Sequence, residues 1–74
     1  MYLVLELQTN NGTTAVVPAV AYADLNKAYQ KYYTALAAAA VSTVEVHTVM
    51  LFTEKGEMIR VEFFEHPAET EEEE

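Results

Sequence analysis

The sequence contains no cysteine and no tryptophan, only two glycines and two prolines, and a single serine, Ser42. Without cysteine, neither a disulfide nor a thiolate metal site can stabilise the fold, and this fits a reducing compartment. A domain of 74 residues buries only about 60% of the surface of its unfolded chain, so it is marginally stable alone. We therefore expect dense packing or a partner subunit to supply the missing stability.

Basic residues are also scarce, with four against twelve acidic residues and a net charge of −8. Residues 1–65 carry a net charge of −3, and residues 66–74 carry −5 without any base. The scattered bases form no basic patch, which disfavours direct binding of nucleic acid. We predict a single domain over residues 1–66, followed by a disordered acidic tail over residues 67–74.

Long apolar runs are missing as well. No run approaches the roughly 20 residues that a membrane-spanning helix needs. The first residues carry Glu6 and no base, so they are typical of a strand rather than of a signal peptide. We therefore expect no membrane contact and a cytoplasmic location.

One segment has a clear helical period, LNKAYQKYYTALAAAA over residues 25–40. Its apolar residues recur at steps of three and four, which is typical of a helix with one buried stripe. Asp24 precedes it and can cap the free amide groups of the first turn. We predict a helix over about residues 25–40. The stripe comprises Leu25, Ala28, Tyr29, Tyr32, Leu36 and Ala39.

A first hairpin precedes this helix. Residues 2–9 alternate as a half-buried strand does, and Asn11-Gly12 favours a tight turn because both residue types tolerate positive φ. The second strand, about residues 13–21, should lie at a sheet edge because Pro18 cannot donate a ladder hydrogen bond. The expected register pairs Leu7 with Val16, Leu5 with Pro18, and Leu3 with Val20.

A second hairpin follows the helix, with strands at about residues 44–53 and 58–65 and a turn centred on Lys55-Gly56. Its expected register pairs Phe52 with Ile59, Met50 with Val61, and Thr48 with Phe63. In both hairpins, one register collects the apolar side chains on one face. The predicted fold class is therefore α+β, with element order ββαββ and a mainly antiparallel four-stranded sheet that carries the helix on one face.

The two faces of this predicted sheet are both apolar. We expect the helix to cover a face made of Leu3, Leu5, Leu7, Val16, Val20, Val44, Val46, Met50, Phe52, Ile59, Val61 and Phe63. The opposite face is too apolar for a solvated surface, so we expect this face, or the Ala37-Ala38 side of the helix, to pack against another copy. The predicted interface residues on that face are Tyr2, Val4, Val17, His47, Val49, Leu51 and Phe64.

Few residues could carry chemistry. We interpret His47 as a histidine packed at an interface, because a catalytic histidine needs a partner within reach and only Glu45 lies nearby in sequence. Glu45, His47 and His66 could cluster, and adventitious metal binding is the alternative. The sequence has no phosphate-binding glycine loop and no visible serine–histidine–acid arrangement. We predict no enzyme activity, no catalytic residues, no cofactor and no metal site.

The run AYQKYYTALAAAAVSTVEVHTVMLFTEKG at residues 28–56, together with LVLELQTN at residues 3–10, resembles small uncharacterised proteins of gut Firmicutes and of their phages or prophages. No activity is assigned to that group, so the resemblance implies no functional residue. It implies a phage or mobile-element context in a bacterial host cell.

We therefore expect a small, non-catalytic interaction or accessory protein that forms a homodimer or higher oligomer and can contact a host or phage protein. The alternative is a phage anti-defence protein that inhibits a host nuclease or sequesters a nucleotide signal. Sequestration would need a pocket with basic or aromatic side chains. The candidates are Lys27, Lys31, Tyr33 and Arg60.

Overall fold

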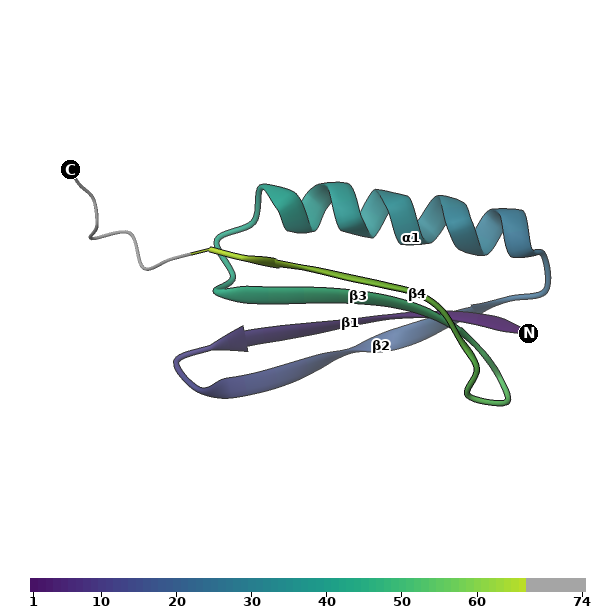
Figure 1. Cartoon of the computed structure of the whole chain (residues 1–74), viewed down its shortest axis with the longest axis horizontal. Coiled ribbons are helices and arrows are strands. Elements are labelled where there is room, and N and C mark those ends of the chain that lie inside the picture. Colours follow the sequence, from purple (N-terminus) through teal and green to yellow (C-terminus); the bar gives the residue numbers. More distant parts are fainter. Residues whose placement is uncertain (67–74) are drawn as a thin grey trace.

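The computed structural model describes residues 1–66, which form one sheet and one helix (Figure 1). The elements are β1 (Tyr2–Asn10), β2 (Thr13–Tyr22), α1 (Leu25–Ala40), β3 (Val46–Thr53) and β4 (Met58–Glu65). The strands are antiparallel to their neighbours in the order β2-β1-β3-β4. The predicted ββαββ architecture is confirmed, with the Pro18 strand at an edge. The predicted acidic tail lies outside the described residues.

Helix α1 begins and packs as its sequence predicts. The Asp24 side chain accepts a hydrogen bond from the Asn26 amide at 2.9 Å, so it caps the first turn. The helix ends at Ala40, and the amide of the C-cap residue Val41 donates to the Ala38 carbonyl at 3.3 Å. Small side chains on the inner stripe allow the helix backbone to approach the sheet closely. Ala28, Tyr32 and Ala39 of the predicted stripe are buried, and so is Ala35, which the prediction left out.

The first hairpin turns where the sequence predicts. Asn11 and Gly12 have φ values of 54° and 79°, as a two-residue turn with positive φ at both central positions requires. Leu7 pairs with Val16, but beyond this pair the register shifts and Val20 faces Val4 instead of Leu3. The shift is a bulge opposite Leu5, at Pro18 and Ala19, where a proline is readily accommodated.

The second hairpin also contains a bulge. Met50 pairs with Val61 and Thr48 with Phe63, as predicted, whereas Phe52 pairs with Met58 rather than with Ile59. The extra residue in β4 leaves Ile59 unpaired, and its side chain packs against the buried core. The predicted turn is wrong by one residue, because the Gly56 amide donates to the Thr53 carbonyl at 2.8 Å and centres the turn on Glu54-Lys55 rather than on Lys55-Gly56.

The helix lies on the face opposite to the one predicted. Val4, Val49 and Leu51 are at most 2% exposed and form the core with α1. Strands β2 and β3 are both antiparallel to β1, so they run parallel to each other and α1 is the crossover between them. Such crossovers are right-handed in almost all proteins. We infer that this handedness selects the face, because both faces are apolar enough to bury.

Candidate functional site

The side of the sheet that faces away from the helix is a continuous apolar surface, which we call the open face. The pairing of the strands places three or four of its residues on each strand. Its only charged side chain is Glu65, at one corner. The residues of the open face are Leu3, Leu5, Leu7, Thr9, Thr14, Val16, Ala21, Val46, Thr48, Met50, Phe52, Met58, Val61, Phe63 and Glu65.

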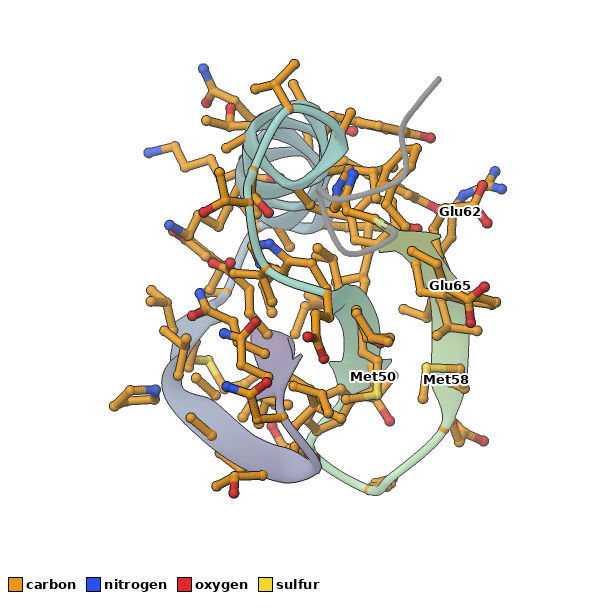
Figure 2. All side chains as sticks on the ribbon, turned by 90° about the vertical axis from the view of Figure 1, so that its left-hand side faces the viewer. Met50, Met58, Glu62 and Glu65 are labelled. Carbon is orange, nitrogen blue, oxygen red and sulfur yellow. The ribbon has the colours of Figure 1, made fainter. Side chains whose placement is uncertain are left out.

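Large apolar side chains of the open face are in contact with solvent. Val16 is 59% exposed, Val61 52% and Phe63 53%. Figure 2 shows Met50 and Met58 on the side of the sheet that is remote from the helix. Four strands about 4.8 Å apart and about 26 Å long give a face of roughly 500 Å². An apolar patch of this size is near the upper end of what monomeric proteins expose, and such patches are often functional.

The predicted interface residues lie on the other face, so that assignment is wrong. Helix α1 covers the predicted interface and leaves most of the predicted core uncovered. The two bulges make exceptions of Val20, which pairs with Val4 on the helix side, and of Ile59, which packs against the buried core. Val4, His47, Val49 and Leu51 are buried, and the remaining three are partly buried: Tyr2, Val17 and Phe64. The sequence therefore indicates the right kind of surface, but on the wrong side of the sheet.

Both edges of the sheet carry features that discourage pairing with another strand. Strand β2 contains Pro18 and its bulge, and strand β4 contains a bulge together with Arg60 and Glu62. Charges, prolines and bulges are the usual protection of an edge strand. A partner is therefore more readily accommodated on the open face than at either edge.

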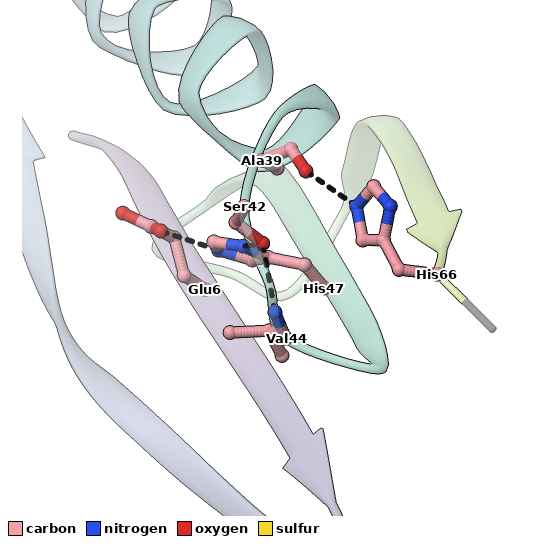
Figure 3. Close-up of polar contacts among 6 residues, drawn as sticks. All are labelled: Glu6, Ala39, Ser42, Val44, His47 and His66. Carbon is pink, nitrogen blue, oxygen red and sulfur yellow. Dashed lines mark hydrogen bonds and ion pairs between the residues drawn. The ribbon is translucent and has the colours of Figure 1, made fainter. Parts of the chain in front are cut away.

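A polar cluster lies between the helix and the sheet, around His47 (Figure 3). His47 is 5% exposed. Its Nε2 lies 2.8 Å from Oε1 of Glu6, and its Nδ1 lies 3.3 Å from Oγ of Ser42. Ser42 Oγ also accepts the Val44 amide at 3.2 Å. Both ring nitrogens of His47 are hydrogen-bonded if the Ser42 hydroxyl donates to Nδ1 and the Nε2–H donates to the Glu6 carboxylate.

This cluster has the composition of a nucleophile, a base and an acid, and sequence reasoning missed it. Glu6 was missed because neither hairpin predicts that β1 pairs with β3. In that pairing His47 lies opposite Gln8, so Glu6 is its diagonal neighbour on the same face of the sheet. The two surface hollows between α1 and β2 and beside the β3–β4 turn, both within the part of the chain that the structure describes, are not lined by Glu6, Ser42 or His47. The arrangement therefore satisfies buried polar groups and ties the α1–β3 connection to β1.

The predicted cluster of Glu45, His47 and His66 does not form a metal site. The Glu45 carboxylate accepts the Asn11 amide at 3.0 Å. As predicted, His66 lies beside Glu45, because its amide donates to the Glu45 carbonyl at 2.7 Å, but the His66 ring bonds to the Ala39 carbonyl at 2.9 Å. Among residues 1–66, no group of three or more metal-ligating side chains is arranged to hold an ion.

Tyrosines and one arginine form an aromatic group where α1 passes over β4. Tyr32 is buried, as predicted, whereas Tyr33 is 50% exposed. The centres of their two rings lie 5.1 Å apart in an edge-to-face arrangement. The Arg60 guanidinium lies over the Tyr29 ring, 5.8 Å from its centre. Burial raises the pKa of the Tyr32 hydroxyl, and the nearby Glu62 carboxylate raises it further. This group therefore contributes packing, together with one cation–π contact.

Two shallow hollows lie away from these features. One, of about 270 Å³, lies between α1 and β2 and is lined by Tyr22, Lys27, Gln30, Lys31 and Thr34. The other, of about 350 Å³, lies beside the β3–β4 turn and is lined by Met1, Tyr2, Thr53, Glu54, Lys55 and Glu57. The first contains two of the four basic residues of the chain. Arg60 and Tyr33 do not line it, so the four candidate sequestering residues do not gather in one pocket.

Comparisons with protein-family models, with curated proteins and with solved structures find no match to this chain. Within the described residues, no helix has the length and apolar character needed to cross a membrane.

Proposed function

We propose that the chain is a small non-catalytic interaction or accessory protein that self-associates through its open face. The observation that supports this proposal is the exposure of Val16, Val61 and Phe63 within an almost uncharged sheet surface. A domain of this size gains little stability from its own core. Covering the open face would add the buried apolar area that the monomer lacks.

A second copy is the partner that fits this surface best. The open face carries one charged side chain, Glu65, at its corner, so two copies can approach although each has a net charge of −8. Two faces of roughly 500 Å² bury about 1,000 Å² in total, which is near the lower limit for a stable interface. Two twisted sheets pack face to face about 10 Å apart. The dimer would then have its two helices on the outside.

The non-catalytic part of the proposal rests on the position of the polar cluster. A catalytic base must come within hydrogen-bond reach of its substrate. His47 is 5% exposed and already bonded through both ring nitrogens. Its role in the proposal is structural, because its two hydrogen bonds tie the α1–β3 connection to β1.

The biological setting belongs to the same proposal and rests on the sequence resemblance. A phage or mobile-element protein of this kind would act in the cytoplasm of a bacterial host and contact a host or phage protein. The anti-defence alternative gains no support from the basic residues, because Lys27 and Lys31 line one hollow while Arg60 lies over Tyr29.

Sedimentation equilibrium over a concentration series tests the proposal. We expect the mass of the 8.3 kDa chain to double within the micromolar range, because interfaces of standard size have dissociation constants of about 1 μM or less and this interface is somewhat smaller. A single species of monomer mass at a concentration about 100 times higher would contradict self-association.

A further inference from the structure

The sulfur atoms of the chain lie in two places. The chain has three methionines and no cysteine. Met50 on β3 and Met58 on β4 both lie on the open face (Figure 2). Met1 lies outside this face, and its amino group pairs with Glu54. Both sulfur atoms that the sheet carries therefore lie on the surface that the proposed dimer would cover.

Met50 lies near the middle of the open face. It stands opposite Leu5 on β1 and Val61 on β4. Met58 pairs with Phe52, two residues further along β3, so it is a diagonal neighbour of Met50. Residues near the centre of an interface contribute most of its binding energy. A polar group introduced at these two positions therefore weakens association more than one introduced at the rim.

The two thioethers are accessible to a small oxidant in the single chain. Met58 is 51% exposed, close to the 54% of Met1, and Met50 is partly exposed. In the proposed dimer, Met50 and Met58 would lie between two sheets about 10 Å apart. Their reactivity should therefore differ between monomer and dimer, whereas the reactivity of Met1 should not.

We propose that Met50 and Met58 are oxidation sites, and that their conversion to sulfoxides by a peroxide keeps the chain monomeric. This inference rests on the proposed self-association through the open face. A lone pair of the thioether sulfur forms the new S–O bond as the O–O bond of hydrogen peroxide breaks. The departing hydroxide takes the proton from the transferred oxygen and leaves as water, so the sulfur loses two electrons and the peroxide gains them.

The sulfoxide oxygen is a polar group that a sheet-to-sheet interface cannot readily accept. Burying a polar atom without a hydrogen bond is unfavourable. Phe52 and Val61, which lie beside Met58 on the open face, have side chains without a donor for this oxygen. Oxidation of Met-rich interfaces disrupts them for this reason.

Sedimentation equilibrium before and after treatment with hydrogen peroxide tests the inference. Mass spectrometry locates the added oxygen, because trypsin places the three methionines in separate peptides, residues 1–27, 32–55 and 56–60. We expect sulfoxides at Met50 and Met58 to raise the dissociation constant at least about 10-fold. Circular dichroism should show an intact fold, because both residues lie outside the buried core. An unchanged dissociation constant with both residues oxidised would overturn the inference, whereas a monomeric untreated chain would overturn the self-association itself.

Met50→Leu with Met58→Leu is the matched control, because leucine nearly conserves the volume of methionine. This chain retains only Met1, so peroxide should leave its dissociation constant unchanged. Dissociation of the oxidised leucine chain would overturn the inference. If the leucine chain does not dimerise, the reductase experiment decides.

Reduction of the oxidised chain should restore the dimer. Methionine sulfoxide reductases of both stereospecificities remove the oxygen as water while two thiols of a dithiol reductant become a disulfide. A chain that stays monomeric after both sulfoxides are reduced would show that other damage caused the dissociation, contrary to the inference.

The rate of oxidation gives an independent measurement. At chain concentrations well below the dissociation constant, Met58 should react about as fast as Met1, which is similarly exposed. Well above the dissociation constant, Met58 should react several times more slowly, because only the monomer exposes it, while the rate at Met1 stays the same. A ratio of the two rates that does not depend on chain concentration would overturn the inference.

Discussion

Val61→Lys is expected to convert the dimer into folded monomers. Val61 lies on the open face beside Met50 and is 52% exposed in the single chain, so a lysine there meets water in the monomer. In a symmetric dimer each substitution occurs twice. About half of each valine side chain is already buried in the single chain, so losing the burial that the dimer adds at two valines costs about 1.5–3 kcal/mol. This raises the dissociation constant by about 10- to 150-fold. Sedimentation equilibrium measures the change.

Val41→Lys is the matched control for this substitution. Val41 is 83% exposed at the C-cap of α1 and lies outside the open face. The same exchange of side chains there should leave the dissociation constant unchanged. If both variants dissociate alike, or if neither does, the open face is not the contact surface.

Leu51→Ala is expected to have the largest effect on folding. Leu51 is completely buried beneath α1, and truncating a buried leucine costs about 2–5 kcal/mol. A chain of 74 residues has a total stability of about 4–11 kcal/mol. The variant should therefore lose much of its stability and be partly unfolded at the low end of this range. Urea denaturation followed by circular dichroism measures the free energy of unfolding.

Leu5→Ala distinguishes the two faces of the sheet. Leu5 lies on the open face, and its side chain is partly exposed in the single chain. Both leucine substitutions should be compared in the Val61→Lys chain, in which dimer formation cannot protect Leu5. There, Leu5→Ala should cost clearly less than Leu51→Ala. The reverse order would place the core on the face that carries Leu5.

Local sequence signals predict the elements and most of the pairing. The period of residues 25–40, the Asp24 cap and the Asn11-Gly12 turn each act within a few residues, and the structure confirms all three. The two bulges could not be predicted in detail, because Pro18 indicates an irregular edge without fixing which pair is shifted. Each bulge also moves the residues beyond it to the other face, so Val20 lies on the helix side although plain alternation would place it with Val16.

The choice of face could not be read from the apolar pattern. Leu5 and Leu51 are equally apolar and lie on opposite faces, so residue type gives no preference between them. The face depends on the path of the chain from β2 over the sheet to β3, which is a property of handedness. The crossover rule applies only once β3 is known to pair with β1, because this pairing makes β2 and β3 parallel.

The polar cluster needed information from three distant parts of the chain. Ser42 follows the helix, His47 lies on β3 and Glu6 on β1, and only the pairing of β1 with β3 brings them together. A signal was nevertheless present. Glu6 interrupts an otherwise apolar face, and a buried carboxylate needs a donor. His47 interrupts the same face.

Methionine methyl groups provide the most direct measurement of contact between two open faces. The chain has three methionines. Met50 and Met58 lie on the open face (Figure 2), whereas Met1 pairs with Glu54 at the turn end of the sheet and serves as an internal control. In a mixture of ¹³C-methyl-methionine chains with unlabelled chains, an isotope-filtered NOE spectrum should show intermolecular contacts from Met50 and Met58 and none from Met1. A dimer without such contacts from Met50 and Met58 would contradict association through the open face.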